Sequence, residues 1–593
     1  MRLALAWRWK GEPPTPREAT AVLERLAARF QPLFKSEPQA TLRSVGPVHL
    51  ASLELPVQGW TFPAAEDDGD DWAFAPEPPL NAGRLLGAPP GEPLLVPLGR
   101  ALRRDPAAVL RELIPPASLL ASDAADGSFH AFTDGLGQGQ LFEVETDRLW
   151  AISNRPSAFL ALGIPLRPVP LEWATRFTLG WFPEGTTGYE GVRVLSPGEH
   201  VRVDAAGIRR ETTDILGDWI HPEPMSADDA LELARTSMVD YLEGLLPYME
   251  RPSLGLSGGW DSRAVASIMR SLDAPHQLRV RGHPERIDVM VAVQLAKMAD
   301  MPIRVKAASG FPPNEPDELR TCLEKALLWH AGYMTLLKQK TFLSRKPQMD
   351  GGVVNLMGQH SGIGKADFAV DIAAHELEPD QYEDALLAFL MKPAPDSFTA
   401  ATRQEVRERL RSCYRAADRY DLEGVHRLHF FYLNEFTRRW GAATVNSQTG
   451  IVVTPFLNPG LIRAAYAFPP ERIPEKPFHS HVTGHHAPDW AAYPYENQLS
   501  SKMIKAGAVP PVEGVRVQAE KDPPPWRRVR RWGKYDHCEY WNHVGHDLVS
   551  EALAEGGFLS ELFDADRLAD EWRQRKGVAD AIATAHLIPK TLG

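Results

Sequence analysis

Cysteine is scarce in this chain of 593 residues, and its three cysteines are Cys322, Cys413 and Cys538. An odd number of widely separated cysteines argues against a disulfide framework, and their spacing matches no zinc site. Long apolar runs are also missing, because none approaches the length of about 20 residues that spans a bilayer. Arg8 and Lys10 closely follow the first short apolar run, so we expect no secretion signal. These absences predict a cytoplasmic protein without a membrane segment.

Positive charge is in deficit. The chain has 65 Lys and Arg residues against 77 Asp and Glu residues, which gives a formal net charge of −12. Proteins that bind nucleic acid broadly do so by neutralising phosphates with cationic side chains. The acidic balance therefore argues against a nucleic-acid partner. The remaining composition, with 44% hydrophobic and 24% charged residues, is typical of a globular protein.

Short alternating segments fill roughly the first third of the chain. Leu3 to Trp9 is expected to form a strand, and residues 16–30 show an apolar helical face. Residues 129–144 predict two strands around a hairpin-type turn at Asp134 to Gly137. Residues 191–203 predict another strand, turn and strand. This pattern indicates a β-rich sandwich up to about residue 215.

Four further stretches have a distinctive composition. The acidic run 66–71 is expected to be a solvated loop, and residues 428–440 to form an amphipathic helix. The four histidines in 479–486 suit either a metal site or a surface segment. The basic and aromatic run 526–532 suits either an acidic peptide or RNA, or a solvated helix with buried tryptophans. For the last two stretches we favour the structural alternative.

Strands alternate with helices after a linker at 222–225. Ser226 followed by Asp229 has the form of a helix cap, and the segments up to residue 305 then read as strand, helix, strand, helix and strand. This order predicts a parallel sheet with helices on both faces. Ligands of such sheets lie at the carboxyl ends of the strands.

The first strand of this sheet runs into Ser257-Gly258-Gly259-Trp260-Asp261-Ser262. Glycines let the backbone approach a ligand closely, and the following helix start offers free N–H groups to an anion. The sequence therefore predicts a phosphate site. Its cradle is expected to consist of Leu256, Ser257, Gly258, Gly259 and Ser262. Asp261 would repel bare phosphate, so its expected role is to hold Mg²⁺.

This loop resembles that of the PP-loop ATP pyrophosphatases, and the order of features over most of the chain resembles the asparagine synthetase B-type superfamily. Four other segments carry the resemblance: Thr133 to Gly137, Ser153 to Arg155, Tyr189 to Gly198 and Thr454 to Leu457. It implies an α/β and β-rich chain with two domains. Residues 1–215 would form an Ntn-hydrolase-like αββα sandwich, and residues 226–593 a PP-loop parallel-sheet synthetase domain with many helices. It also implies that Val280 packs on adenine and that Gly358 lies in the ATP site.

The chain departs from this family in three places. Arg2 stands where glutamine-dependent members carry the nucleophilic cysteine. In the second glycine-rich turn, Gln359 and Gly362 replace two acids, one of them the second metal ligand. Asp367 lies five residues further on, and it could replace that ligand only if the loop follows a different path from the loop of the family. The late lysine of the family has candidates in Lys476, Lys502 and Lys505, none in a convincing context, and no catalytic residue is assigned.

The resemblance implies an ATP- and Mg²⁺-dependent ligase that adenylates a small-molecule or peptide carboxylate and forms an amide with release of AMP and pyrophosphate. Because glutamine is not expected to supply the amine, we expect an enzyme similar to β-lactam synthetases or lasso-peptide macrolactam cyclases. A precursor peptide with leader-binding or protease partners is then an expected partner. The alternative is a nucleotide-binding pseudoenzyme that acts as a scaffold. The acidic charge and absent cysteine pairs disfavour PP-loop tRNA modification.

Overall fold

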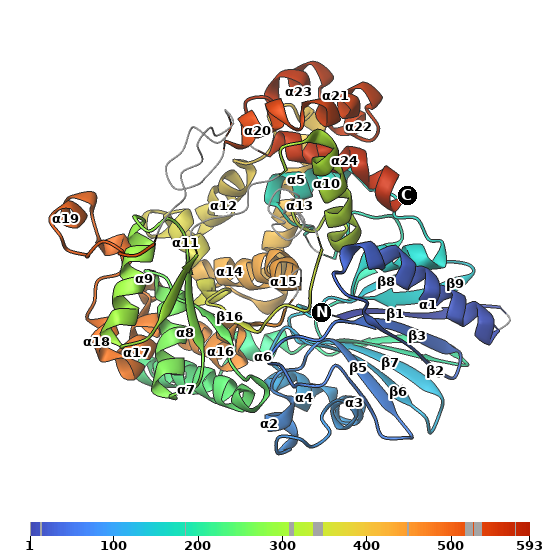
Figure 1. Ribbon diagram of the computed structural model, residues 1–593, viewed down its shortest axis with the longest axis horizontal. Coiled ribbons are helices and arrows are strands. Elements are labelled where there is room, and N and C mark those ends of the chain that lie inside the picture. The colour runs from blue at the N-terminus through green and yellow to red at the C-terminus, as the bar shows by residue number, and fades with distance from the viewer. Residues whose placement is uncertain are drawn as a thin grey trace.

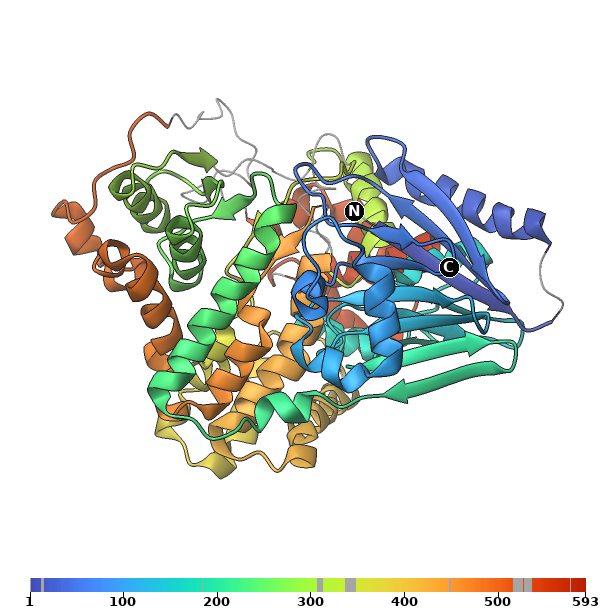
Figure 2. The ribbon, with the colours of Figure 1, turned by 90° about the horizontal axis from the view of Figure 1, so that it is seen from below.

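The computed structural model describes residues 2–11, 15–183, 185–306, 313–335, 348–446, 450–515, 526, 536–575 and 577–593. Figures 1 and 2 show two parts side by side, a sandwich of antiparallel strands and a part built around a short parallel sheet. The helices of the C-terminal region lie along the top of the molecule in Figure 1. The basic and aromatic run 527–532 lies outside the described residues.

Two antiparallel sheets of six strands each form the sandwich. In spatial order, the first sheet contains β10 (Val192–Val194), β8 (Phe142–Glu145), β9 (Leu149–Ser153), β1 (Arg2–Trp9), β3 (Val48–Glu54) and β2 (Gln39–Val45). The second contains β12 (Gly207–Thr212), β11 (Glu199–Asp204), β7 (Ser128–Thr133), β6 (Ser118–Asp123), β5 (Trp72–Glu77) and β4 (Ala65–Asp67). The sandwich helices are α1 (Pro16–Phe30), α2 (Ala82–Leu86), α3 (Leu95–Arg104), α4 (Pro106–Glu112) and α5 (Pro170–Leu179).

The alternation of strand β1 explains the layering. Leu3 and Leu5 belong to the core that contains the buried face of α1, whereas Ala4 and Ala6 belong to a separate core between the two sheets. Successive side chains of a strand point to opposite faces, so both faces of the sheet are buried. Helix α3 packs against β5 and β6 of the other sheet. The order of layers is therefore helix, sheet, sheet, helix, as expected for an αββα sandwich.

Two predicted hairpins are wrong in their pairing, although their strands are present. Strands β7 and β8 belong to different sheets, and so do β10 and β11. The turn at Asp134 carries the chain across the sandwich instead. Its buried carboxylate accepts the backbone amides of Ala117, Leu136, Gln138 and Gly139 at 2.7 to 3.2 Å. These four bonds replace the strand-to-strand bonds of a hairpin.

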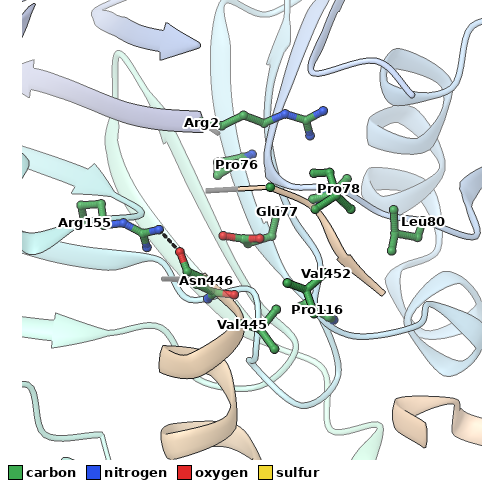
Figure 3. Close-up of a pocket in the computed structure, with 12 residues that line it drawn as sticks. Arg2, Pro76, Glu77, Pro78, Leu80, Pro116, Arg155, Val445, Asn446 and Val452 are labelled. Atoms are coloured by element: carbon green, nitrogen blue, oxygen red, sulfur yellow. Dashed lines mark hydrogen bonds between the residues drawn. The ribbon is translucent and has the colours of Figure 1, made fainter. Parts of the chain in front are cut away.

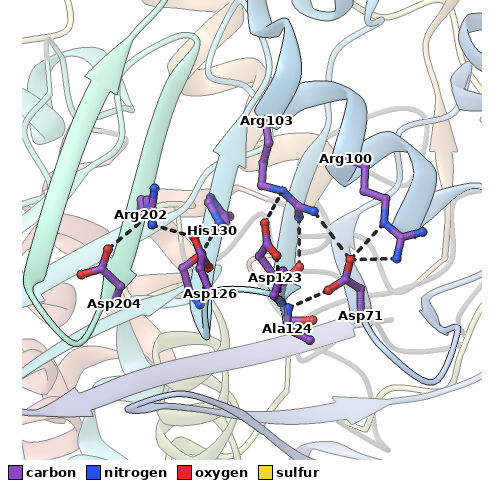
Figure 4. Close-up of polar contacts among 12 residues, drawn as sticks. Asp71, Arg100, Arg103, Asp123, Ala124, Asp126, His130, Arg202 and Asp204 are labelled. Atoms are coloured by element: carbon purple, nitrogen blue, oxygen red, sulfur yellow. Dashed lines mark hydrogen bonds and ion pairs between the residues drawn. The ribbon is translucent and has the colours of Figure 1, made fainter.

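The acidic run 66–71 is exposed at 67–70, as expected for a solvated loop, but its two end residues have structural roles. The carboxylate of Glu66 accepts the amides of Leu94 to Val96 and so caps the start of α3. Asp71 is buried and accepts the Ala124 amide at 2.8 Å. Its other oxygen pairs with Arg100 at 2.9 Å, as Figure 4 shows. The acids tie helix α3 to the second sheet.

A five-stranded parallel sheet organises the second part. Its strands, in spatial order, are β15 (Ile303–Lys306), β14 (Gln277–Arg281), β13 (Ser253–Gly255), β16 (Asn355–Leu356) and β17 (Val452–Val453). In chain order this is 3-2-1-4-5, so the strand order reverses at β13. The carboxyl end of the strand at such a reversal is where open α/β sheets bind ligands. The predicted parallel sheet is therefore present, and the glycine loop follows β13.

Helices surround this sheet and continue to the C-terminal region. Those up to residue 491 are α6 (Leu216–Ile220), α7 (Ala227–Leu245), α8 (Trp260–Ser271), α9 (Ile287–Met298), α10 (Pro316–His330), α11 (Asp367–Asp371), α12 (Tyr382–Met391), α13 (Ala400–Arg415), α14 (Gly424–Phe431), α15 (Ala442–Asn446), α16 (Pro459–Ala467), α17 (Pro477–His486) and α18 (Pro488–Ala491). The remaining ones are α19 (Ser501–Lys505), α20 (His537–His543), α21 (His546–Glu555), α22 (Leu559–Leu562), α23 (Ala565–Glu571) and α24 (Val578–Leu592).

The segment expected as an amphipathic helix at 428–440 is buried on nearly all sides. It continues from α14 into a π-helix, Tyr432–Gly441, in which Glu435, Arg438 and Arg439 are all buried. A helix buried all round does not need a polar face. Among the described residues, no helix combines the length and apolar character that a membrane crossing requires.

Candidate functional site

The glycine loop lies between β13 and α8, as predicted, and each of its first three amides has a partner within the protein. The Ser257 amide donates to the Ser262 hydroxyl at 2.9 Å, and the Gly259 amide donates to the Ser257 hydroxyl at 3.1 Å. The Gly258 amide donates to the Asp288 carboxylate of α9 at 2.6 Å. The hydroxyls of Ser257 and Ser262 also lie 2.8 Å apart. The loop is thus held in a defined conformation before any ligand binds.

Gly258 is required here because neighbouring elements approach closely. A Cβ atom at this position would lie 3.0 Å from the Cβ of Glu496 and 3.1 Å from that of Val291. Arg263, which is completely buried, donates to the carbonyl oxygens of Gly258, Trp490 and Tyr493. This arginine therefore fastens the loop to the chain after α18.

An aromatic stack covers the start of α8. The rings of Trp260 and Tyr495 lie parallel with centroids 3.4 Å apart, and the Arg263 guanidinium lies 3.7 Å from the Tyr495 centroid. The ammonium of Lys476 lies 5.4 Å from the Trp260 ring. Such stacked cations and rings attract one another through the ring quadrupole. Sequence reasoning did not find this stack, because its two rings are far apart in the chain.

The second glycine-rich turn, after β16, packs directly on the first. A Cβ at Gly358 would lie 2.6 Å from the Asp261 carbonyl carbon and 2.8 Å from the Ser262 nitrogen. Only glycine permits this approach. The two turns that the sequence singled out therefore meet at the carboxyl end of the sheet.

Asp261 is the centre of a charged cluster. Its Oδ2 lies 3.1 Å from the Lys365 ammonium, and its Oδ1 lies 3.1 Å from Nε2 of the fully buried His479. The Asp261–His479 contact does not have the geometry of a hydrogen bond, and it is an ion pair only when the His479 ring is protonated. Burial alone would raise the pKa of Asp261, but His479 and Lys365 outweigh this effect and lower the pKa to about 2. Asp261 is therefore ionised at neutral pH.

Asp367 occupies the space next to Gly362. A Cβ at Gly362 would lie 2.4 Å from Oδ2 of Asp367 and 2.3 Å from the Tyr432 ring. The Gly362 amide donates to the Tyr432 hydroxyl at 3.0 Å. Burial raises the pKa of Asp367, Lys365 opposes this effect, and Asp261 adds to it. The Asp367 carboxylate therefore lies in the space that a side chain at position 362 would enter.

The other predicted site residues lie on the sheet. Leu256 is buried, and its amide donates to the Arg279 carbonyl at 2.9 Å. Val280 is buried in β14, the strand adjacent to β13. Among the lysine candidates, Lys476 is near the aromatic stack, whereas Lys502 and Lys505 lie on the exposed helix α19. The structure therefore brings one of the three to the site.

Sequence reasoning missed Lys365 and misjudged His479. Lys365 directly follows Gly364, the last residue of the second glycine-rich turn. Its place beside this turn could have indicated a site residue. Residues 479–486 form the end of α17, and His479 is completely buried while His485 is exposed. The expectation of a surface segment is thus wrong for His479, because α17 packs against α8 and brings this ring to Asp261.

A cluster of Glu551, Glu555 and His586 also has ligand atoms close enough for a metal ion. The Lys590 ammonium already lies between them, 2.8 Å from Glu551, 3.0 Å from Glu555 and 3.1 Å from the His586 ring. A cation is therefore supplied by the chain itself, and we assign this cluster a structural role.

Arg2, at the start of β1, is buried. Arg2 donates to the carbonyl oxygens of Ala75, Phe62 and Pro63 at 3.0 to 3.4 Å. Burial lowers its pKa to about 10. Arg2 and Arg155 line a cavity of about 30 Å³ that also contains Glu77, at the junction with the second part (Figure 3). This volume has room for about one or two water molecules.

No family model matches the chain, and no curated protein matches its sequence. Two solved structures show a distant similarity at 11% sequence identity over 53% of this chain. One is described as the allosteric regulatory enzyme of purine biosynthesis, of which 82% is covered with a TM-score of 0.24. The other is glutamine phosphoribosylpyrophosphate amidotransferase from B. subtilis in complex with ADP and GMP, of which 83% is covered with a TM-score of 0.23. Similarity at these TM-scores carries no argument about fold or function.

Proposed function

We propose that this protein is an ATP-dependent, AMP-forming amide ligase with a PP-loop synthetase domain and an Ntn-like sandwich. The observation that carries the proposal is the place of the glycine loop. It follows β13, the strand at which the order 3-2-1-4-5 reverses, and leads into the start of α8. This is the position where parallel sheets bind nucleotides, and a helix start favours an anion. A carboxylate substrate would be adenylated here, with pyrophosphate as the leaving group.

The described residues fit a magnesium ion at Asp261. Its buried Oδ1 makes no hydrogen bond but lies 3.1 Å from Nε2 of His479, so a metal ion bound to this oxygen would lie beside that ring. Mg²⁺ usually binds through one or two carboxylates, substrate phosphates and waters. When bound, the ion would neutralise charge on the leaving pyrophosphate. Lys365 and His479 hold Asp261 in place, and Asp367 is the candidate for a second carboxylate near it.

The amine is proposed to come from the substrate and not from glutamine. Arg2 occupies the position of the nucleophile, and the cavity beside it is much smaller than glutamine. A thiolate is the group that glutaminase chemistry of this type needs. We therefore place the protein in specialised-metabolite or peptide biosynthesis, as a lasso-peptide macrolactam cyclase or β-lactam synthetase type. Its proposed partners are a small-molecule or peptide carboxylate and, for a peptide, a precursor peptide with its leader-binding or protease proteins. We propose a cytoplasmic location.

One observation favours the alternative, a nucleotide-binding pseudoenzyme that serves as a scaffold. The Gly258 amide is already bonded to Asp288, and Asp261 is already paired with Lys365 and His479. A site whose charges are satisfied internally gains less from binding ATP and Mg²⁺. The two functions differ in chemistry, since a scaffold binds ATP but releases no pyrophosphate.

Pyrophosphate release from ATP, screened against candidate carboxylates with amines present, tests the proposal. A ligase gives release that depends on one carboxylate and on Mg²⁺, whereas a scaffold gives ATP binding without release with any substrate. Glutamate release from glutamine should stay at background in the same mixtures. Sustained glutamate release would contradict the assignment of the amine donor.

A further inference from the structure

Four cations lie on one face of β14 and β15, two neighbouring strands of the parallel sheet. Arg279 of β14 is the register partner of Arg304 of β15. Arg281 and Lys306 are partners two residues further along the same strands. Because alternate residues of a strand point to the same side, the four side chains share one face, which we call the cationic face. Arg281, Arg304 and Lys306 are exposed, and Arg279 is half-buried.

The opposite face of the two strands is covered by helix α9. This helix packs against both strands, and its residues Val289 and Val291 share a buried core with Leu278 and Val280 of β14. Parallel sheets usually have both faces covered. Since three of its four cations are exposed, the cationic face stays open within the described part of the chain.

The charge of the cationic face is not balanced by acids. Among the described residues, none of the four cations forms an ion pair. Arg279 donates to the neutral amide oxygen Oδ1 of Asn355 at 2.6 Å, and burial and the neighbouring Arg281 lower the pKa of Arg279. The sequences of 307–312, which follows β15, and of 336–347, which precedes β16, contain no Asp or Glu.

Such an arrangement costs stability. Neighbouring strands lie about 4.8 Å apart, so like charges at partner positions such as Arg281 and Lys306 repel each other. Charge on an edge strand also prevents aggregation, but this purpose requires cations on β15 alone, because β14 is an inner strand. The cations are also retained in a chain with a net charge of −12. Binding of an anion would explain all four.

We propose that the cationic face binds an acidic peptide segment in an extended conformation, with Asp or Glu at alternate positions. The two cations of each strand are two residues apart, which is the spacing of side chains on one face of a bound strand. Among the described residues, β15 pairs only with β14, so its outer edge is open to an added strand. The inference rests on the proposed function only in taking this peptide as part of the ligation substrate.

The charge of the whole chain favours a peptide over a nucleic acid. A long polyanion would extend from the cationic face over the acidic remainder of the surface, where it is repelled. A short peptide meets only the local positive charge.

Fluorescence anisotropy with the full chain and no ATP tests the inference. The probe is a labelled peptide in which glutamate alternates with threonine. A second peptide has the same composition with its glutamates in one block, and a third has glutamine in place of glutamate. We expect the block peptide to bind about two- to thirtyfold more weakly than the alternating one, because half of its glutamates face away from the cations. The glutamine peptide should bind more weakly still, and added salt should weaken the alternating peptide.

Two results of this comparison would overturn the inference. One is equal binding of the alternating and block peptides, which would exclude an extended segment with acids on one side. The other is tighter binding of a labelled RNA oligonucleotide of the same net charge, which would exclude a peptide as the preferred ligand.

Variants of β15 locate the binding surface. Arg304→Gln with Lys306→Gln should weaken the alternating peptide about two- to thirtyfold, since two exposed charge pairs are lost. The control is Arg209→Gln, which removes an exposed cation from β12, an edge strand of the sandwich, and should change nothing. Arg281→Gln is a second test on β14, and circular dichroism checks that each variant folds. Wild-type affinity in the folded β15 variant would overturn the inference.

The result is independent of the ligase test. If the alternating peptide binds selectively but no carboxylate gives pyrophosphate, the inference stands and the proposed function fails. If pyrophosphate is released with a carboxylate but the alternating peptide is not selected, the proposed function stands and this inference fails.

Discussion

The backbone amide of Gly258 donates a hydrogen bond of 2.6 Å to the carboxylate of Asp288. This amide belongs to the loop that is proposed to hold the phosphates of ATP, so a carboxylate occupies one of its donors. Glu496 adds a second acid, because its own amide donates to the Gly258 carbonyl at 3.0 Å. Burial and the nearby Asp288 raise the pKa of Glu496. Two acids thus lie beside a loop that is proposed to bind a polyanion.

The first prediction follows from this contact. Asp288→Asn keeps an acceptor for the Gly258 amide but removes a negative charge near the phosphates. We expect ATP to bind about 5- to 30-fold more tightly, because the removed carboxylate charge would repel the phosphates by about 1–2 kcal/mol. Calorimetric titration with ATP measures the change, and Asp300→Asn, after the end of the same helix α9, is the control. Weaker binding in Asp288→Asn would mean that the carboxylate holds the loop in its binding conformation.

The second prediction concerns the contact between the two glycine-rich turns. Gly358→Ala places a Cβ within 2.6 to 2.8 Å of backbone atoms of Asp261 and Ser262, so the turns must separate. We expect a loss of stability of about 1–3 kcal/mol and at least a tenfold loss of ATP affinity. Gly255→Ala is the matched control, because a Cβ there has no neighbour within 4 Å. If chemical denaturation and ATP titration show the two variants to be alike, the turns do not need this contact.

Local signals predicted the parts of the structure that depend on neighbours in the chain. The loop at Ser257 to Ser262 was found from its glycines and flanking apolar segments, and Ser226 was identified as a cap from its spacing to Asp229. Helix α1 has the bounds that its apolar face indicated. The two glycine-rich turns were also both identified, although nothing in the sequence shows that they touch.

Long-range contacts explain what was missed. His479 reaches Asp261 because α17 packs on α8, across more than 200 residues of chain, and no spacing rule covers such a distance. The hairpins were misassigned for the same reason, since a turn signal does not show which sheet each strand joins. Glu66 looked like part of a solvated loop because its partner, the start of α3, lies 28 residues later.

The third prediction concerns the buried charges at the junction of the two parts. Glu77 is partly buried and its pKa is raised chiefly by burial, while Arg155 and Arg2 favour its charged form. Arg2→Met removes one of these cations and three hydrogen bonds to backbone carbonyls. We expect a loss of about 3–5 kcal/mol in the free energy of unfolding, because breaking a buried charge group leaves its partner uncompensated. Denaturation in urea gives this value.

A double variant provides the control for that experiment. Arg2→Met with Glu77→Leu removes both charges, so part of the lost stability should return. The exposed contact of Arg8 with the Ala205 carbonyl gives a second comparison, and Arg8→Met should cost less than about 1 kcal/mol. If Arg2→Met is as mild as Arg8→Met, the arginine is not needed to balance Glu77.

The last prediction concerns the acid stability that Asp261 provides. Its pKa in the folded protein is about 2, below the usual value of about 3.9. A lowered folded pKa means that the stabilisation is present above about pH 4 and is lost as the pH falls toward 2. Because the side chain is 32% exposed, we discount for solvent and expect about 1–2 kcal/mol.

Asp261→Asn should therefore abolish this part of the acid dependence and leave the Lys365 ammonium without its counter-charge. Unfolding free energies between pH 2 and 6 measure it. The control is Asp367→Asn, for which the sign is opposite, because burial raises the pKa of Asp367 and its ionised form destabilises the fold. The same Asp261→Asn variant should lower pyrophosphate release by at least about 10²–10³ if the proposed function holds, since a charge contact at the reaction centre is lost. It should also make ATP binding independent of Mg²⁺. If the unfolding free energy of Asp261→Asn falls between pH 6 and 2 as it does in the wild type, Asp261 is not stabilised by Lys365 and His479. If pyrophosphate release also stays near the wild-type rate, Asp261 is not the metal ligand and Asp367 becomes the candidate.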